Sequence, residues 1–277
     1  MNRRLPTWRE DDRLRDECGI VAVSGAGRAS QLAFLGLYAL QHRGQESCGV
    51  VSIDESGDAH THKAMGLVAD AFDDATLARL AGSTALGHTR YSTAGASRLR
   101  NAQPVVVNYR HGTMTLAHNG TLTNAGALRD RLTDEGAIFQ TDSDSEAVIH
   151  LIARSRRGSP DQQVDDALSQ LVGAFSIVMS IGNTVYAVRD ARGFRPLVLG
   201  RLDDAAVVAS ETCALDIMGA DYVRDVQPGE VLKICDGIVT NLRPLEPRSH
   251  SPCLFELVYF ARPDSRMGGC SVDAARR

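Results

Sequence analysis

The chain has 277 residues, of which 43% are apolar and 23% are charged, and its formal net charge is −4. These values are ordinary for a globular domain, and the slight negative charge gives no basic surface for nucleic acid or an anionic membrane. The run of about 18 apolar residues that a membrane-spanning helix needs does not occur. The first seventeen residues carry five arginines and five acids without an apolar stretch, which excludes a secretory signal.

The six cysteines stand apart along the chain, at positions 18, 48, 213, 235, 253 and 270. They form no CxxC pair, which excludes a zinc finger or zinc ribbon. A dense disulfide framework belongs to much shorter secreted chains. We therefore expect reduced thiols and a cytoplasmic protein.

In chain order, the apolar pattern first predicts a buried strand over 18–24 and a helix over 28–41. Residues 110–112 (Arg-His-Gly) are typical of a hairpin turn, and helices follow at 123–135 and 144–157. The strands expected in this part of the chain are 49–54, 84–91, 105–109 and 113–118.

From residue 173 onward the apolar runs are short, and one short helix is expected at 211–218. Because helices and strands come in blocks, an α+β layered fold is favoured over a strictly alternating parallel sheet. Stretch 243–252, rich in proline and charge, is typical of a linker. The strand-like run 253–260 after it suggests the beginning of a second domain. The strands expected before the linker are 173–181, 184–189, 196–200, 206–210 and 229–235.

Cys18 stands between the charged leader, residues 1–17, and an apolar run, residues 19–24. If the chain were cut after Glu17, one residue would carry both a thiol and a free α-amine. An α-amine has a reference pKa of about 7.7–8.0, so at working pH it can accept the thiol proton. The alternative is a buried strand cysteine without a chemical role, and on position alone that alternative is stronger.

Two segments downstream carry groups that suit a small zwitterionic ligand. Arg90 ends an expected strand and begins a loop of small and hydroxylated residues that includes Thr93. Its guanidinium could bind a carboxylate, or it is a surface salt-bridge partner. Asp144 opens an expected helix in the acidic run 141–146. Its carboxylate could bind an ammonium group, or it complements the helix dipole.

The pair Asn119-Gly120 follows an expected hairpin strand. Asn-Gly is first of all a turn signal. Its alternative role is an oxyanion hole, because the side-chain amide and the Gly120 N–H can point the same way. Combined with the thiol of Cys18, Arg90 for a carboxylate and Asp144 for an amine, the set describes a site for glutamine.

Five motifs resemble one family in their order and spacing: the run that begins CGIVAV at Cys18, ALQHRGQESCG (39–49), GHTRYSTAG (87–95), HNGTLTN (118–124) and SDSE (143–146). The chain resembles the glutaminase half of the amidophosphoribosyltransferases, which are class II glutamine amidotransferases that begin purine synthesis. The resemblance covers residues 18–277. Residues 40–47 separate this family from the hexosamine-forming amidotransferases, which have YRGYDSAG where this chain has LQHRGQES.

The resemblance implies an αββα N-terminal-nucleophile (Ntn) hydrolase fold, in which two stacked antiparallel sheets lie between layers of helices. It implies that Cys18 is the nucleophile, that its own α-amine is the base, and that Asn119 and Gly120 form the oxyanion hole. Glutamine would then be hydrolysed to glutamate and ammonia, and Tyr259 would lie near the interdomain face. The residues implied to hold the substrate are Arg90, Thr93, Asp144 and Arg43.

The same resemblance divides the chain into a propeptide (1–17), a glutaminase domain (18–250) and a junction (251–277) to a phosphoribosyltransferase domain. The segments that bind phosphoribosyl pyrophosphate with Mg²⁺ are not found in these residues, so we expect no transferase activity from them alone. Cys253 matches the first ligand of a [4Fe–4S] cluster in the iron–sulfur members, while the glutaminase itself needs no cofactor. A homotetramer is expected of the full-length enzyme.

Two other functions remain open. Residues 25–30 (GAGRAS) imitate a dinucleotide-binding fingerprint, with Ser30 where its third glycine belongs, so an NAD-binding oxidoreductase is the second hypothesis. The third is a fragment that folds but is neither processed nor active.

Overall fold

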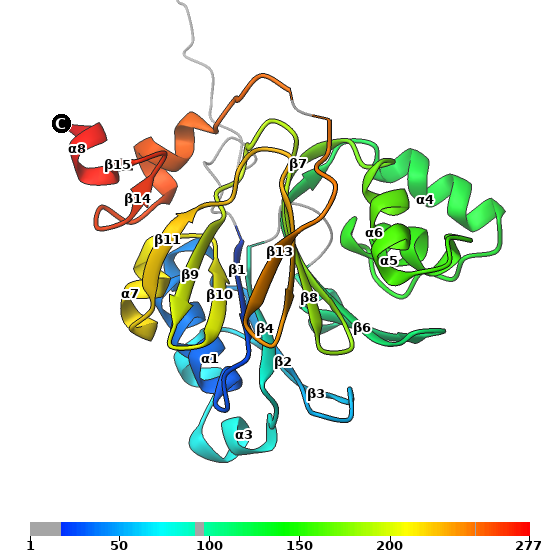
Figure 1. Ribbon diagram of the computed structural model, residues 1–277, viewed down its shortest axis with the longest axis horizontal. Coiled ribbons are helices and arrows are strands. Elements are labelled where there is room, and N and C mark those ends of the chain that lie inside the picture. The colour runs from blue at the N-terminus through cyan, green and yellow to red at the C-terminus, as the bar shows by residue number, and fades with distance from the viewer. Residues whose placement is uncertain (1–17, 92–96, 247) are drawn as a thin grey trace, which may run out of the picture.

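The structure is a computed structural model that describes residues 18–91, 97–246 and 248–277 (Figure 1). Two antiparallel sheets form its centre. Sheet A has the strand order β11 (Asp221–Asp225), β9 (Val198–Leu202), β10 (Ala205–Ala209), β1 (Gly19–Ser24), β4 (Thr84–Arg90), β2 (Ser47–Ile53) and β3 (Ala59–Met65). Sheet B has the order β13 (Ile238–Asn241), β12 (Val231–Cys235), β8 (Thr184–Arg189), β7 (Gly173–Ile181), β6 (Gly112–Leu122) and β5 (Val105–Tyr109).

Helices cover the outer faces of both sheets (Figure 1). Those on the side of sheet A are α1 (Ala29–Ala39), α2 (Val68–Ala71), α3 (Asp74–Arg79) and α7 (Thr212–Met218). Those on the side of sheet B are α4 (Ala125–Asp134), α5 (Ser145–Arg154) and α6 (Pro160–Leu168). The pair β14 (Arg266–Met267) and β15 (Cys270–Ser271) precedes the last helix, α8 (Val272–Arg276). The predicted four-layer αββα sandwich is confirmed.

The central strand β1 shows how the sequence builds these layers. Val21 and Val23 pack against α1, whereas Ile20 and Ala22 face sheet B in the core between the two sheets. Successive side chains of a strand point to opposite faces, so an all-apolar strand is expected where both faces are covered. Gly36 of α1 lets the helix approach closely, since a Cβ there would lie 3.0 Å from a methyl carbon of Val21.

Several expected elements are confirmed near their predicted bounds, and others were missed. The missed helices and strands are β3, α2, α3, α6, β11, β13, β14, β15 and α8. Edge strand β3 contains the polar run His60–Lys63, which hid its strand character. Helix α6 carried a start signal that was overlooked, because Ser159 caps it by accepting a hydrogen bond from the N–H of Gln162 and Pro160 occupies its first turn.

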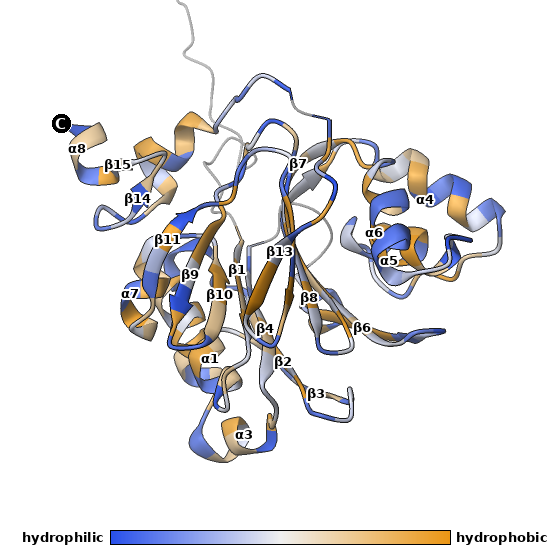
Figure 2. Cartoon of the chain, in the orientation of Figure 1, coloured by the Kyte–Doolittle hydropathy of each residue, from blue (hydrophilic) through white to orange (hydrophobic). Residues whose placement is uncertain are grey.

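The predicted strand over 253–260 is wrong. Residues 254–260 are helical, and we call them the C-terminal helical segment. Figure 2 colours much of this segment as hydrophobic, yet four of its apolar side chains, Leu254, Phe255, Val258 and Tyr259, are exposed while Glu256 is 1% exposed. The apolar pattern of this run predicted a strand and gave no sign that Glu256 is buried.

The dinucleotide-binding alternative is contradicted by the topology. Residues 25–30 do connect a strand, β1, to a helix, α1. However, β1 pairs antiparallel with both of its neighbours, β4 and β10. The fingerprint acts at the carboxyl edge of a parallel βαβ sheet, which is a different arrangement. Within the described ranges, no helix is both long and apolar enough to span a membrane.

Candidate active site

Cys18 and Arg90 lie at the same end of two neighbouring strands. Gly19 of β1 pairs with Thr89 of β4, which brings Cys18 beside the end of β4. The Cys18 thiol lies 3.5 Å from the carbonyl oxygen of Tyr91, as a weak donor to it. Cys18 is 7% exposed and Arg90 is 3% exposed. The thiol and the guanidinium are therefore held at the same buried end of two central strands of sheet A.

A histidine hydrogen bond joins this end of sheet A to sheet B. Nε2 of His88, on β4, donates to the carbonyl oxygen of His118, on β6, at 3.1 Å. Burial lowers the pKa of His88 to about 3, so the ring is neutral near pH 7 and its Nε2 must carry the proton to donate. The contact lies two residues before Arg90 and one residue before Asn119, so the ends of β4 and β6 are tied together here.

Asn119 and Gly120 lie inside β6 and not in a turn, so the turn interpretation of this pair is wrong. Asn119 is fully buried, and neither its amide nitrogen nor its amide oxygen has a hydrogen-bond partner in the part of the chain that the structure describes. Gly120 has φ +134°, and a Cβ there would lie 2.0 Å from the carbonyl oxygen of Ala174. Glycine is required at this position for β6 to pass β7.

An unsatisfied buried polar group costs about 1–3 kcal/mol. Such groups in a folded protein call for an explanation, and one explanation is a bound ligand. The amide of Asn119 is a donor and an acceptor at once, so it is suited to a ligand with a polar oxygen or nitrogen.

Asp144 lies beside the same strand, at the start of α5. Its Oδ2 accepts from the N–H of Leu122 at 2.9 Å, and its Oδ1 is 3.6 Å from Nδ1 of His118. Burial by itself would raise the pKa of Asp144, but the charge and hydrogen bond of His118 and the N–H of Leu122 outweigh it and hold the pKa below its ordinary value. Asp144 is therefore a carboxylate near neutral pH and can attract an ammonium group.

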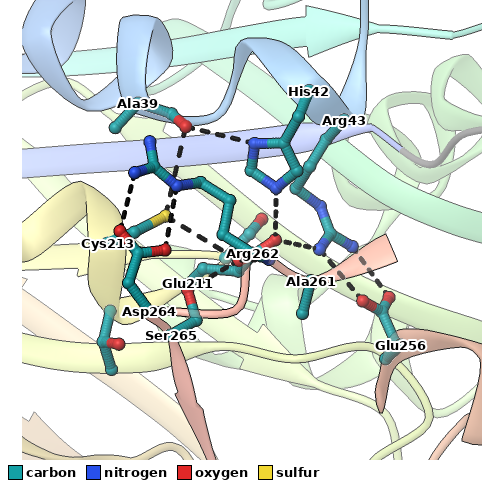
Figure 3. A network of polar contacts seen from close by, with 12 residues as sticks. Ala39, His42, Arg43, Glu211, Cys213, Glu256, Ala261, Arg262, Asp264 and Ser265 are labelled. Atoms are coloured by element: carbon teal, nitrogen blue, oxygen red, sulfur yellow. Dashed lines mark hydrogen bonds and ion pairs between the residues drawn. The ribbon is translucent and has the colours of Figure 1, made fainter. Parts of the chain in front are cut away.

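Arg43 lies in the short turn Gln41–Arg43 that follows α1 and is fully buried. Its Nε–H donates to the carbonyl oxygen of Cys18 at 3.1 Å. Its terminal nitrogens bind Glu211 and Glu256, the latter through both carboxylate oxygens at 2.7 and 2.9 Å (Figure 3). We call His42, Arg43, Glu211 and Glu256 the Arg43 cluster.

The Arg43 cluster is charged and well paired. Burial would lower the pKa of Arg43, but the carboxylates of Glu256 and Glu211 raise it above its ordinary value. Burial likewise opposes ionisation of Glu211, and Arg43 and His42 reverse that effect and lower its pKa. Sequence reasoning singled out Arg43 but missed both glutamates. A lone acid inside the apolar run 253–260 was the available signal for Glu256, because a buried acid needs a partner.

Gly44 follows Arg43 and packs on the strand that ends in Arg90. A Cβ at Gly44 would lie 2.7 Å from backbone atoms of Arg90 and Thr89. The two arginines of the site are thus connected through touching backbones.

The remaining predictions concern Thr93, the leader and Cys253, and two further cysteines are buried. Thr93 and the leader 1–17 lie outside the described residues. Cys253 is partly exposed, and nowhere in the described ranges do three or more His, Cys, Asp or Glu side chains gather to hold a metal ion. A [4Fe–4S] cluster needs four ligands, and the described residues bring no such set together around Cys253. Cys48 and Cys213 are buried thiols, and burial raises the pKa of each to about 12.

Comparison with known proteins relates this site to one family. Residues 88–216 match the model of a glutamine amidotransferase domain. The amidophosphoribosyltransferase of Rhizobium etli is 46% identical over 275 residues, which cover 97% of this chain and 55% of that protein. Amidophosphoribosyltransferase 1 of Arabidopsis thaliana, a chloroplastic protein, is 47% identical over 271 residues, covering 96% of this chain and 47% of that protein. The chain thus spans about half the length of the curated relatives it matches.

Solved structures give the same result. The glutamine phosphoribosylpyrophosphate amidotransferase of Bacillus subtilis, complexed with ADP and GMP, aligns with a TM-score of 0.87 at 40% identity over 92% of this chain and 55% of that chain. A structure described as the allosteric regulatory enzyme of purine biosynthesis aligns with a TM-score of 0.88 at 41% identity, with the same coverage. The two-sheet fold is that of their glutaminase domain. This chain therefore carries a glutamine amidotransferase domain, and over that domain it is similar to the amidophosphoribosyltransferases.

Proposed function

We propose that this chain hydrolyses the side-chain amide of glutamine to glutamate and ammonia, with Cys18 as the nucleophile. The observation that best supports the proposal is the buried, unpartnered amide of Asn119, tied by the His88 to His118 contact to the strand end that holds Cys18. A buried amide N–H that is available to donate a hydrogen bond is suited to stabilise a developing oxyanion.

The chemistry needs a free α-amine on Cys18, so removal of the leader 1–17 is part of the proposal. The α-amine takes the thiol proton, directly or through a water molecule, and the thiolate attacks the amide carbon of glutamine. The resulting oxyanion accepts hydrogen bonds from the Asn119 amide and the Gly120 N–H. The proton then passes to the leaving nitrogen, ammonia departs, and water hydrolyses the thioester to glutamate.

Recognition of the substrate is assigned to groups of matching charge. The guanidinium of Arg90 would bind the α-carboxylate, and the Asp144 carboxylate would bind the α-ammonium group. Thr93 would act in the loop that closes over the ligand. In the complete protein, the ammonia would be passed to phosphoribosyl pyrophosphate, in keeping with the names of the relatives.

The test uses Cys18→Ala with Cys48→Ala and Cys213→Ala as matched controls. We expect Cys18→Ala to lose glutaminase activity by roughly a thousandfold or more, because removing a nucleophile removes the covalent route. The controls should keep it, since their thiols stay protonated at neutral pH. A diazo-ketone analogue of glutamine should label Cys18 alone, and intact mass should show a chain that begins at Cys18. Label on another cysteine, or full activity with residues 1–17 attached, would contradict the proposal.

A further inference from the structure

The Arg43 cluster joins three distant parts of the chain to the start of β1. Arg43 follows α1, Glu211 follows β10, and Glu256 belongs to the C-terminal helical segment (Figure 3). All three side chains are at most 1% exposed. The Cys18 carbonyl that Arg43 binds is attached to the Cα atom that carries both the thiol and the amine. The direction of the guanidinium therefore influences where both reactive groups lie.

The two glutamates differ in how many other groups hold them. Glu211 also accepts from the His42 ring at 2.8 Å, from the backbone N–H of Arg262 at 2.9 Å and from the Ser265 hydroxyl at 2.7 Å. Glu211 is thus anchored independently of Arg43.

Glu256 directs both of its oxygens to Arg43, and its one further ion-pair contact is with Nη1 of Arg195 at 3.6 Å. This two-point contact fixes the plane of the Arg43 guanidinium, because a carboxylate and a guanidinium bind through parallel hydrogen bonds.

The C-terminal helical segment turns its acid inward and most of its apolar side chains outward. Leu254 is 70% exposed and Val258 is 59% exposed, in contrast to Glu256 at 1%. A buried ion pair is a poor source of stability, because desolvation of both charges offsets their attraction. The burial of Glu256 with Arg43 therefore favours a role in orientation.

We infer that Glu256 is a positioning residue, which fixes the plane of Arg43 and, through the Nε bond of Arg43, the carbonyl of Cys18. This inference rests on the proposed function of Cys18 as nucleophile. Glu256 bonds to Arg43, which itself bonds to the Cys18 carbonyl, so it acts on the rate of attack and not on the binding of glutamine.

The first test is the Glu256→Gln variant of the full-length protein. We expect kcat for glutamine to fall about tenfold to a hundredfold, the size expected when a reacting group is misplaced by about 1 Å, with KM nearly unchanged. The acid limb of the pH profile should move to lower pH, because loss of a buried negative charge disfavours the protonated amine. Glu256→Asp should recover part of kcat. Glu55→Gln, the same change on the exposed β2–β3 turn, is the matched control.

The second test separates orientation from stability. The double variant Arg43→Met/Glu256→Met replaces the buried pair with apolar side chains, which often restores stability. We expect its urea midpoint to return toward the wild-type value while kcat stays low, because the Arg43 N–H that binds the Cys18 carbonyl has been removed.

A readout without glutamine keeps this inference apart from the proposed function. The rate at which iodoacetamide alkylates Cys18, followed by peptide mass, should fall severalfold in Glu256→Gln and stay at the wild-type value in Glu55→Gln. An inactive wild-type protein would overturn the proposed function, and the alkylation rates would still decide the role of Glu256. Wild-type kcat and alkylation in Glu256→Gln, or recovery of both in the double variant, would overturn the inference.

Discussion

The Arg43 cluster and Asn119 are two buried polar regions whose hydrogen bonding is opposite. In the cluster, a buried guanidinium binds the Cys18 carbonyl and two carboxylates, and the Glu211 carboxylate also accepts from His42, Arg262, Ser265 and the Cys213 thiol. At Asn119, both polar atoms of an equally buried amide lack partners among the residues described. The cluster satisfies most of its hydrogen-bonding groups internally, whereas Asn119 keeps a donor and an acceptor for the ligand that we propose. The comparison predicts that the first region stabilises the site and the second binds substrate.

The largest effect expected from this comparison is on stability, in Glu211→Ala. Removing one partner of a buried ion pair leaves the other uncompensated and typically costs about 3–5 kcal/mol. Urea unfolding measures the loss. Glu230→Ala, which breaks the more exposed pair with Arg224, is the control and should cost no more than about 1 kcal/mol. Equal losses in the two variants would show that the cluster is not a special anchor.

Asn119→Ala should show the reverse behaviour. We expect kcat to fall about a hundredfold to a thousandfold, the usual cost of losing an oxyanion donor. The free energy of unfolding should stay the same or rise, because the amide makes no bond that folding would lose. Steady-state kinetics and urea unfolding of the same preparation test both parts, with the exposed Asn108→Ala as control. A large loss of stability with normal kcat would place Asn119 with the structural groups.

Arg90→Lys and Asp144→Asn should act on binding. A lysine ammonium cannot reproduce the two-point contact of a guanidinium with a carboxylate, so we expect KM for glutamine to rise about tenfold or more. Asp144→Asn should raise KM through the lost attraction for the α-ammonium group. Initial rates over a range of glutamine concentrations measure both. Unchanged KM in both variants would mean that the substrate is held by other residues.

The smallest expected effect concerns His88, which joins the two regions. Its pKa is about 3 when folded and about 6.5 in an unfolded chain. Between these pH values His88 is protonated in the unfolded chain but neutral in the folded one. Its contribution to the free energy of unfolding is therefore complete above pH 6.5 and decreases as the pH drops toward 3. We expect about 1 kcal/mol of loss per pH unit from this group. Urea midpoints at pH 7 and pH 5 should differ less in His88→Asn than in the wild type.

The sequence predicted the layers well because β1 and its neighbours are apolar on both faces, a pattern that few environments other than a central strand allow. It failed at β3, where polar residues occupy an exposed edge strand. It also failed at residues 254–260, where a strand was expected, because the inward turn of Glu256 depends on Arg43, which is 213 residues earlier in the chain. Patterns within a segment cannot show a partner that distant.

The site was predicted unevenly for a similar reason. Cys18, Arg90, Asn119 and Asp144 stand within distinctive motifs, and the structure places them at adjoining strand and helix ends. Glu211 stands in no such motif, and only its position after β10 brings it to Arg43. Motifs identify the groups that we propose bind the ligand, while the groups that hold them in place become visible only in three dimensions.

The contact of Gly44 with the backbone of Arg90 has a consequence for energetics. Because the two segments touch without room for a Cβ, Arg90 cannot shift to meet a ligand without pressing on the turn that carries Arg43. Binding of a ligand to Arg90 and the orientation of the Arg43 guanidinium should then be energetically coupled. Double-mutant cycles between Arg90 and Glu256 should therefore show a coupling free energy.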